Sequence, residues 1–184
     1  PLSEMTREEL WQLFPIILME YDPVWKTWYE EENRAIIAAL GDAISRVNHI
    51  GSTSVEGLTA KPTVDILLEL HPDTELQPVI ERLVALGWRW LNRPTAGADS
   101  DIAYLNKGYT ENGFAERVFH LHVRRPGDWD ELYFRDYLCE HPSACDEYGK
   151  LKRSLMVQFK HNRDAYTTQK TGFVQQHTRL ARQL

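Results

Sequence analysis

The sequence has little cysteine, because only Cys139 and Cys145 occur among its 184 residues. Neither a disulfide framework nor a structural zinc site of the C-x₂-C kind is expected from this pair. No apolar run approaches the ~20 residues needed to span a bilayer, and the first residues do not form a secretory signal pattern. These absences predict a cytoplasmic protein with no membrane partner.

The chain also lacks an excess of positive charge. Its formal net charge of −6 argues against a general nucleic-acid binder, which needs a basic face for the phosphate backbone. The charge is uneven, however, since the first third is acidic and the part from Lys150 onward is basic. A basic C-terminal face could meet polyphosphate or RNA, although a solvated helix face explains most of this pattern equally well.

Several common catalytic motifs are absent. Gly51 and Gly57 are separated by five residues, but no Gly-Lys-Ser/Thr follows, so this is not a P-loop. The sequence has no Rossmann G-x-G-x-x-G, no H-E-x-x-H and no G-x-S-x-G. Kinase-type phosphate binding through a P-loop is therefore not expected.

The length predicts one domain over residues 1–184, and the periodicity predicts both strands and helices, an α/β (α+β) arrangement. A helical N-terminal brace is expected over 1–41, a sheet core over 42–125 and a helical C-terminal part over 126–184. Asp128 is expected to cap the first C-terminal helix. The expected strands are 44–50, 62–70, 88–91, 101–107 and 117–124, with a hairpin turn at 108–113.

The stretch His49–Leu70 has the layout of a strand, a tight turn, a short helix and a second strand. Backbone N–H groups freed by Gly51 can form an anion-binding concavity with nearby hydroxyl groups, and phosphate is the ligand expected there. Those hydroxyl groups belong to Ser52, Thr53 and Ser54. The second strand would bring Asp65 to the same place, where its carboxylate could hold Mg²⁺ bound to the phosphate.

The string G-S-T-S-V-E-G-L-T-A-K-P-T-V-D-I-L at 51–67 resembles the signature of the GrpB family, whose members are regarded as relatives of the nucleotidyltransferase superfamily. Further matches are F-H-L-H-V at 119–123, F-R-D-Y-L at 134–138 and Y-G-K-L-K at 148–152, so the resemblance covers nearly the whole chain. The resemblance implies a nucleotidyltransferase-like α/β fold, with a small mixed sheet flanked by helices, more firmly than it implies a reaction.

The sequence departs from the superfamily pattern at Leu67. Such enzymes place two carboxylates two residues apart on the second strand, where they share two metal ions, but here only Asp65 is acidic. Glu69 lies on the same strand face but about 13 Å away, too far to share an ion. A one-metal site, a binding module and a different chemistry all remain open. The candidates for a second carboxylate are Asp99, Asp101 and Glu116.

His120 and His122 alternate with apolar residues on one strand, so their rings lie on one face about 6.6 Å apart. They can converge with Asp65 on one metal ion, or act as acid and base on a phosphorylated substrate. By the resemblance, they occupy a place where a superfamily relative often has a third carboxylate. Scaffold or surface positions are the alternative, because a His-x-His pair alone is a weak metal signal.

The cations expected near bound phosphate are Lys61, Arg135 and Lys152, of which the last two lie in the strings that match the family. Arg163, Tyr166 and Lys170 lie at helix spacing near the start of the last helix and could reach the same pocket. Ordinary salt bridges are the alternative for each of the cations, including a bridge from Asp65 to Lys61.

Together these patterns lead to one hypothesis and one alternative. The hypothesis is an enzyme of nucleotidyltransferase type that binds a nucleotide triphosphate with Mg²⁺ or Mn²⁺ and moves a nucleotidyl or phosphoryl group to an unknown acceptor. The alternative is a non-catalytic module of the same fold that binds a nucleotide or another phosphorylated ligand. The base, the acceptor and the oligomeric state are left open by the sequence.

Overall fold

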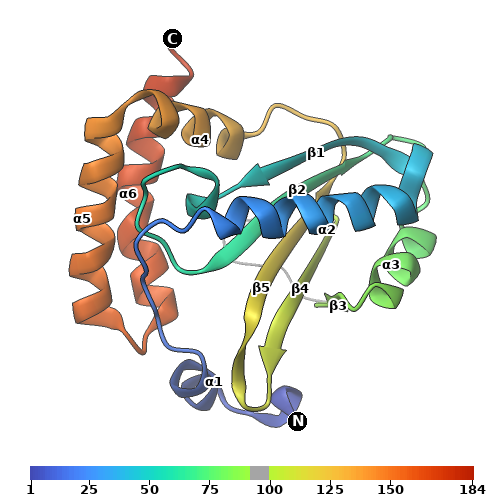
Figure 1. Cartoon of the computed structure of the whole chain (residues 1–184), viewed down its shortest axis with the longest axis horizontal. Coiled ribbons are helices and arrows are strands. Elements are labelled where there is room, and N and C mark those ends of the chain that lie inside the picture. The colour runs from blue at the N-terminus through green and yellow to red at the C-terminus, as the bar shows by residue number, and fades with distance from the viewer. Residues whose placement is uncertain (92–99) are drawn as a thin grey trace.

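A computed structural model describes residues 1–91 and 100–184. Its centre is one five-stranded mixed sheet in the order β1-β2-β5-β4-β3 (Figure 1). Only β2 and β5 pair in parallel, and the other neighbours are antiparallel. The strands are β1 Ile44–Ile50, β2 Thr63–Leu70, β3 Arg89–Trp90, β4 Ala103–Thr110 and β5 Gly113–Arg124. The predicted mixed α/β sheet is confirmed.

Helices lie on both sides of this sheet. Figure 1 shows α2 running across the sheet, α3 beside it, and α5 and α6 side by side at the opposite end with α4 above them. The helices are α1 Arg7–Leu13, α2 Val24–Leu40, α3 Leu76–Ala85, α4 Asp130–Glu140, α5 Pro142–Phe159 and α6 Arg163–Ala181. Short 3₁₀ turns cover Leu2–Glu4, Gly41–Ala43 and Ser52–Ser54 (η1, η2 and η3). The C-terminal part is helical, as predicted.

The two faces of the sheet differ in chemistry because strand residues alternate between them. On β2, Val64, Ile66 and Leu68 are fully buried in the main apolar core, which α2 and α3 cover. Asp65 and Glu69 point to the other face, toward the C-terminal helices. The ionisable side chains of the candidate site come from this second, polar face, from the helices opposite it and, for Lys61, from the segment before β2.

The hairpin between β4 and β5 differs from the prediction. The turn is shorter than expected, because Thr110 pairs with Gly113 and only two residues separate the strands. Gly108 lies inside β4, at a register shift with φ +91°, and a Cβ there would come within 2.3 Å of the Arg117 carbonyl oxygen. The glycine that suggested a turn is thus needed for a β-bulge.

The start of α4 also differs from the prediction. Asp128 was expected to cap this helix, but the N-cap residue is Trp129. The Asp128 carboxylate instead accepts a hydrogen bond from Arg182 at 2.7 Å, at the end of α6. Asp128 therefore does not cap α4, and its carboxylate links the start of α4 to the end of α6.

His49, near the end of β1, is held as part of the scaffold. Its ring stacks on Tyr29 with a centroid distance of 4.7 Å, and its Nε2 atom lies 2.9 Å from the Thr53 hydroxyl. Burial lowers the pKa of His49 to about 4, with smaller effects from Asp65 and Arg135. The imidazole is therefore neutral in the folded protein at pH 7.

This burial predicts a loss of stability in mild acid. The unfolded chain takes up a proton on His49 below pH 6.5, whereas the folded protein does so only near pH 4. The free energy of unfolding should therefore fall by about 3 kcal/mol between these values. Urea unfolding at pH 7.0 and 4.5 measures it. His49→Gln should reduce this pH dependence, and an unchanged dependence would contradict the assignment.

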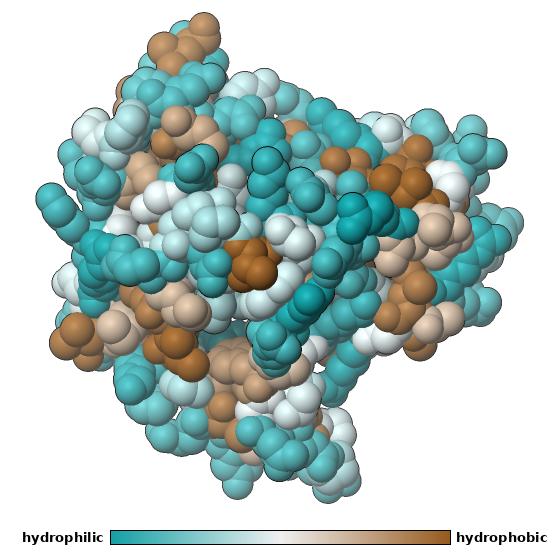
Figure 2. Space-filling model, in the orientation of Figure 1, coloured by the Kyte–Doolittle hydropathy of each residue, from teal (hydrophilic) through white to brown (hydrophobic). Residues whose placement is uncertain are grey.

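The exterior is predominantly polar on the face drawn in Figure 2, where hydrophobic side chains form small separate groups. Within residues 1–91 and 100–184, no helix has the length and apolar character needed to cross a membrane.

Candidate functional site

The candidate site begins with Asp65 and His120, which face each other on the two parallel strands. The register of β2 and β5 pairs these two residues directly. The His120 Nδ1 atom lies 3.2 Å from an Asp65 carboxylate oxygen, and the two side chains are 19% and 26% exposed. A ligand can therefore reach both, and the predicted association of Asp65 with His120 is present.

A continuous set of hydrogen bonds orients this pair. The Arg163 guanidinium donates to the Tyr109 hydroxyl at 3.3 Å, and this hydroxyl lies 2.6 Å from His120 Nε2. With a neutral ring, the Tyr109 O–H donates to Nε2 and His120 Nδ1–H donates to Asp65. Both ring nitrogens of His120 are thus engaged, which favours an orienting role. Metal ligation by His120, also predicted from the sequence, would require giving up one of these bonds.

The protonation states agree with this arrangement. Burial lowers the pKa of His120, and the hydrogen bond to Asp65 offsets this only in part. Burial alone would raise the pKa of Asp65, but the hydrogen bond and charge of His120, with His122 and Lys61, hold it below its ordinary value. At neutral pH the site therefore holds an anionic Asp65 beside a neutral His120.

The turn after β1 lies against the Asp65 carboxylate. Gly51 has φ +73°, and a Cβ at this position would come within 2.5 Å of Asp65 Oδ2. The Ser54 hydroxyl donates to the Gly51 carbonyl, and the buried Thr53 hydroxyl donates to the Thr63 carbonyl. Two of the three predicted hydroxyl groups therefore stabilise the turn, which leaves Ser52 as the one best placed for a ligand.

Three lysines gather opposite Asp65. Lys61 follows the turn, while Lys152 and Lys170 come from α5 and α6. Lys152 is only 2% exposed. Burial lowers the pKa of Lys61 and Lys152 well below the ordinary value and that of Lys170 to about 8, and the positive charges of the cluster lower those of Lys61 and Lys152 further. Asp65 acts in the opposite direction on all three.

These cations have too few negative partners. In the described part of the chain, no carboxylate lies within 4 Å of Lys61, Lys152 or Lys170. Their ammonium groups lie over tyrosine rings instead, with Lys61 and Lys170 at 5.4 and 4.5 Å from the Tyr166 ring centroid. The buried Tyr166 hydroxyl and Arg163 Nε also lack hydrogen-bond partners among these residues. Such a cluster is suited to a ligand with several negative charges.

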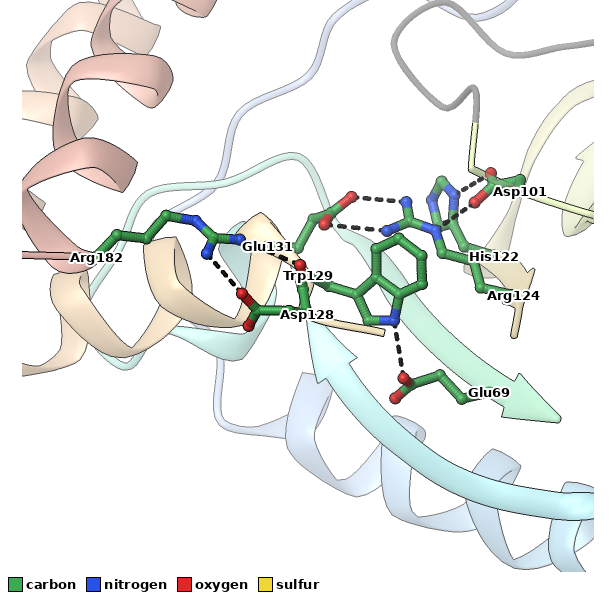
Figure 3. A network of polar contacts seen from close by, with 8 residues as sticks. All are labelled: Glu69, Asp101, His122, Arg124, Asp128, Trp129, Glu131 and Arg182. Carbon is green, nitrogen blue, oxygen red and sulfur yellow. Dashed lines mark hydrogen bonds and ion pairs between the residues drawn. The ribbon is translucent and has the colours of Figure 1, made fainter. Parts of the chain in front are cut away.

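His122 lies on the same face but belongs to a second network. Its Nδ1 atom is 2.7 Å from Asp101, which also accepts from Arg124 at 2.7 Å (Figure 3). Arg124 in turn donates to Glu131 at 2.6 Å. Asp101, a candidate for the second carboxylate, is thus directed at His122 and Arg124 rather than at Asp65.

The other carboxylate candidates do not supply the missing partner either. Glu116 is exposed on the outer half of β5, and Asp99 lies outside the described residues. Leu67, where a second carboxylate was expected, is fully buried. Glu69 lies in a separate contact, where it accepts from Trp129 Nε1 at 2.8 Å (Figure 3) and is paired with Arg46.

The fit to a divalent metal is limited to one protein carboxylate. Among residues 1–91 and 100–184, no group of three or more His, Cys, Asp or Glu side chains is arranged to hold an ion. Asp65 is reachable and ionised, and Mg²⁺ commonly takes one or two carboxylates and completes its shell with substrate phosphates and water. The residues present therefore fit a metal that arrives with a phosphorylated ligand.

Arg135 contacts the end of β1. Its guanidinium donates to the His49 carbonyl at 3.1 Å and to the Asn48 side chain at 3.3 Å, so it binds α4 to β1. It also lines a cavity together with Gly51 and Ser52. The structure thus brings Arg135 to the turn after β1.

Sequence reasoning did not find Tyr109 or Tyr148, which complete the site. Tyr109 connects Arg163 to His120, and the ring of Tyr148 lies 4.8 Å from the Lys152 ammonium. The sequence signal for Tyr148 was its place in Y-G-K-L-K, which spaces it four residues from Lys152 on one helix face. Tyr109 gave no such signal, because its role depends on the bulge at Gly108.

The fold and this site define a mixed α/β protein in which a cluster of lysines lies between a polar sheet face and a helical C-terminal part. The model of the family described as GrpB protein matches residues 15–180 of the chain. The chain belongs to the GrpB family.

Similar proteins agree with this assignment. The chain is 28% identical over 162 residues to the Glutamate-rich protein GrpB of Alkalihalophilus pseudofirmus, covering 86% of this chain and 91% of that protein. It is 34% identical over 161 residues to a UPF0157 protein of Pseudomonas aeruginosa, covering 86% and 64% of the two chains. The crystal structure of conserved protein GrpB from Enterococcus faecalis superposes with a TM-score of 0.77 at 30% identity, covering 90% and 96%.

A protein named dephospho-CoA kinase, from Mycolicibacterium paratuberculosis, is 27% identical over 176 residues. The match covers 85% of this chain but only 43% of that protein.

Proposed function

We propose that this protein binds a nucleotide triphosphate or a similar polyphosphorylated ligand between the polar sheet face and helices α5 and α6. In its catalytic form, the proposal is an enzyme of nucleotidyltransferase type that moves a nucleotidyl or phosphoryl group to an acceptor. The observation that carries it is the cluster of Lys61, Lys152 and Lys170 with Arg163, which faces the single carboxylate of Asp65.

The positive charge of the lysine cluster favours a polyanionic ligand. A buried lysine without a counter-ion is costly, and this chain keeps the buried Lys152 beside the half-buried Lys61 and Lys170 although its net charge is −6. A polyphosphate would neutralise these charges and form charge-assisted hydrogen bonds with them. The N–H groups at the Ser52 turn and the Ser52 hydroxyl would bind further phosphate oxygens.

Asp65 is the residue proposed to hold Mg²⁺ or Mn²⁺. The ion would supply neutralisation of phosphate charge. In this arrangement His120 keeps the Asp65 carboxylate in place, while His122, held by Asp101, is a candidate acid or base on the same face. The protein named dephospho-CoA kinase is in line with a phosphorylated ligand, but the alignment to less than half of it supports no particular reaction.

The second candidate is a non-catalytic module that senses the same class of ligand. The observation that favours it is the buried Leu67 at the position of the second carboxylate, together with the commitment of Asp101 to His122 and Arg124. Both candidate functions require the lysine cluster to bind phosphate, and they differ in whether a reaction follows binding.

The test is a thermal-shift panel of the four ribonucleoside triphosphates, each with and without Mg²⁺ or Mn²⁺. A ligand at 100 times its dissociation constant should stabilise the fold by about 2.7 kcal/mol. We expect a shift that depends on the metal and is lost in Asp65→Asn, because the carboxylate is the one protein ligand proposed for the ion.

The exposed Asp73→Asn is the matched control and should shift as the wild type does. If Asp65→Asn retains the full metal-dependent shift, Asp65 is not the protein ligand of the metal ion. A cooperative transition unmoved by any triphosphate, with or without metal, would count against both candidates.

A further inference from the structure

A cavity of about 440 Å³ lies next to the proposed phosphate site and shares the turn at Gly51 and Ser52 with it. Its walls come from the turn after β1, from α4 with the residues before it, and from the second half of α6. Its volume is in the range of ordinary small-molecule pockets, which begin at about 300 Å³. The cavity is large enough for an organic group of the size of a nucleoside.

Most of the charged residues that line this cavity are paired with one another, and Arg135 is paired with Asp136, which is not part of the lining. Arg124 binds Glu131, and Arg182 binds Asp128 at 2.7 Å and Asp130 at 2.6 Å. Figure 3 shows the Arg124 and Arg182 groups approaching Glu131 and Asp128 from opposite sides. The cavity thus offers hydrogen-bonding groups without the excess positive charge of the lysine cluster. It suits the uncharged, polar part of a ligand better than its phosphates.

The remaining wall is apolar. Four side chains form this wall, and they belong to or pack against a second hydrophobic cluster, separate from the main core, under α4, α5 and α6. They are Val55, Phe134, Leu138 and Val174. An apolar wall opposite a wall of donors and acceptors is the environment that a polar ring system requires, because its faces are apolar and its edges form hydrogen bonds.

The turn at Gly51 and Ser52 is common to the cavity and the phosphate site. Both residues line the cavity, and Gly51 also lies against the Asp65 carboxylate. Ser52 lies beside Tyr148, whose ring lies 4.8 Å from the Lys152 ammonium. A single ligand lying across this turn would place one end among the lysines and the other end in the cavity.

We infer that the cavity binds the nucleoside, or an equivalent uncharged ring-bearing group, of a ligand whose phosphates occupy the lysine cluster. This inference rests on the proposed function and adds the class of the organic half. Recognition is divided between two regions, so the lysines supply affinity for phosphate and the cavity supplies selectivity for what is attached to it.

Titration calorimetry with tripolyphosphate and the four ribonucleoside triphosphates, at one metal concentration, tests the division. At least one of the four ribonucleoside triphosphates should bind the wild type at least about tenfold more tightly than tripolyphosphate does. Val174→Phe, which fills the cavity from α6, should abolish that preference and leave the tripolyphosphate affinity within about twofold. Lys170→Met should weaken both kinds of ligand.

Gln175→Phe is the matched control, since it adds the same bulk at the neighbouring exposed position of α6. Val174→Met, a smaller and more flexible change, serves where the phenylalanine variant does not fold. A wild type that binds tripolyphosphate as tightly as every nucleotide would overturn the inference and leave the proposed function standing. A preference that survives Val174→Phe and Val174→Met would also overturn it. A wild type that binds none of these ligands would refute the proposed function, and the inference with it.

Discussion

Replacing Lys152 by methionine is expected to weaken tripolyphosphate binding by about 10- to 100-fold and at the same time to stabilise the ligand-free protein. The loss of affinity corresponds to one charge-assisted hydrogen bond, about 1.5–3 kcal/mol. The gain in stability, about 1–3 kcal/mol, arises because methionine keeps the buried stem and removes an ammonium group that has no counter-ion. Calorimetry measures the affinity, and urea unfolding measures the stability.

The gain should also depend on pH in a defined direction. Burial lowers the pKa of Lys152 below its ordinary 10.5, so the unfolded chain holds a proton that the folded protein gives up earlier as the pH rises. The wild type therefore becomes more stable relative to Lys152→Met as the pH approaches 10.5. Lys150→Met, on the exposed side of the same helix, should show neither effect. A variant that binds normally, or that is much less stable than the wild type, would show that Lys152 has a purely structural role.

Gly51→Ala is expected to lower the free energy of unfolding by about 2–5 kcal/mol and to abolish ligand binding. The backbone at Gly51 lies at φ +73° and ψ −177°, a region that residues with a Cβ rarely adopt, which costs about 1–3 kcal/mol. The new methyl group would also come within 2.5 Å of Asp65 Oδ2 and displace the carboxylate that orients the site. Chemical unfolding and the thermal-shift panel measure the two effects.

Two comparisons separate the causes. Gly41→Ala also has a positive φ, at +51°, but a Cβ there has nothing within 4 Å, so it reports the backbone cost alone. In a double-mutant cycle, Asp65→Ala should recover part of the loss caused by Gly51→Ala, because it removes the atoms that clash. If the two glycine variants cost the same and the cycle shows no coupling, the close approach to Asp65 has no energetic role.

The sequence identified the elements that local pattern determines. The strand Ile44–Ile50 was predicted with its observed bounds, and the turn at Gly51 follows it as expected. The face shared by His120 and His122 also followed from alternation along β5. These features depend on neighbours a few residues apart, which periodicity and turn residues report directly.

The contacts that the sequence did not predict are those that depend on how distant segments of the chain pack together. The parallel register sets His120 beside Asp65, whereas the segment before β4 brings Asp101 to His122, although both histidines point to one face. Arg163 and Lys170 enter the site only because α6 packs back toward the sheet, and no local pattern fixes that docking. The same holds for Asp128, whose sequence context indicates a cap while its partner comes from the far end of the chain.

The parallel pairing of β2 with β5 also has a consequence for the order of folding. The antiparallel pairs β1–β2 and β4–β5 join neighbouring segments and can form early, whereas β2 and β5 meet only after a long loop has closed. Asp65 and His120 come from different early pairs, and Lys152 and Lys170 arrive with the last two helices. Ligand binding would therefore report that the whole chain has folded, since neither half of the molecule holds both the Asp65 carboxylate and all three lysines.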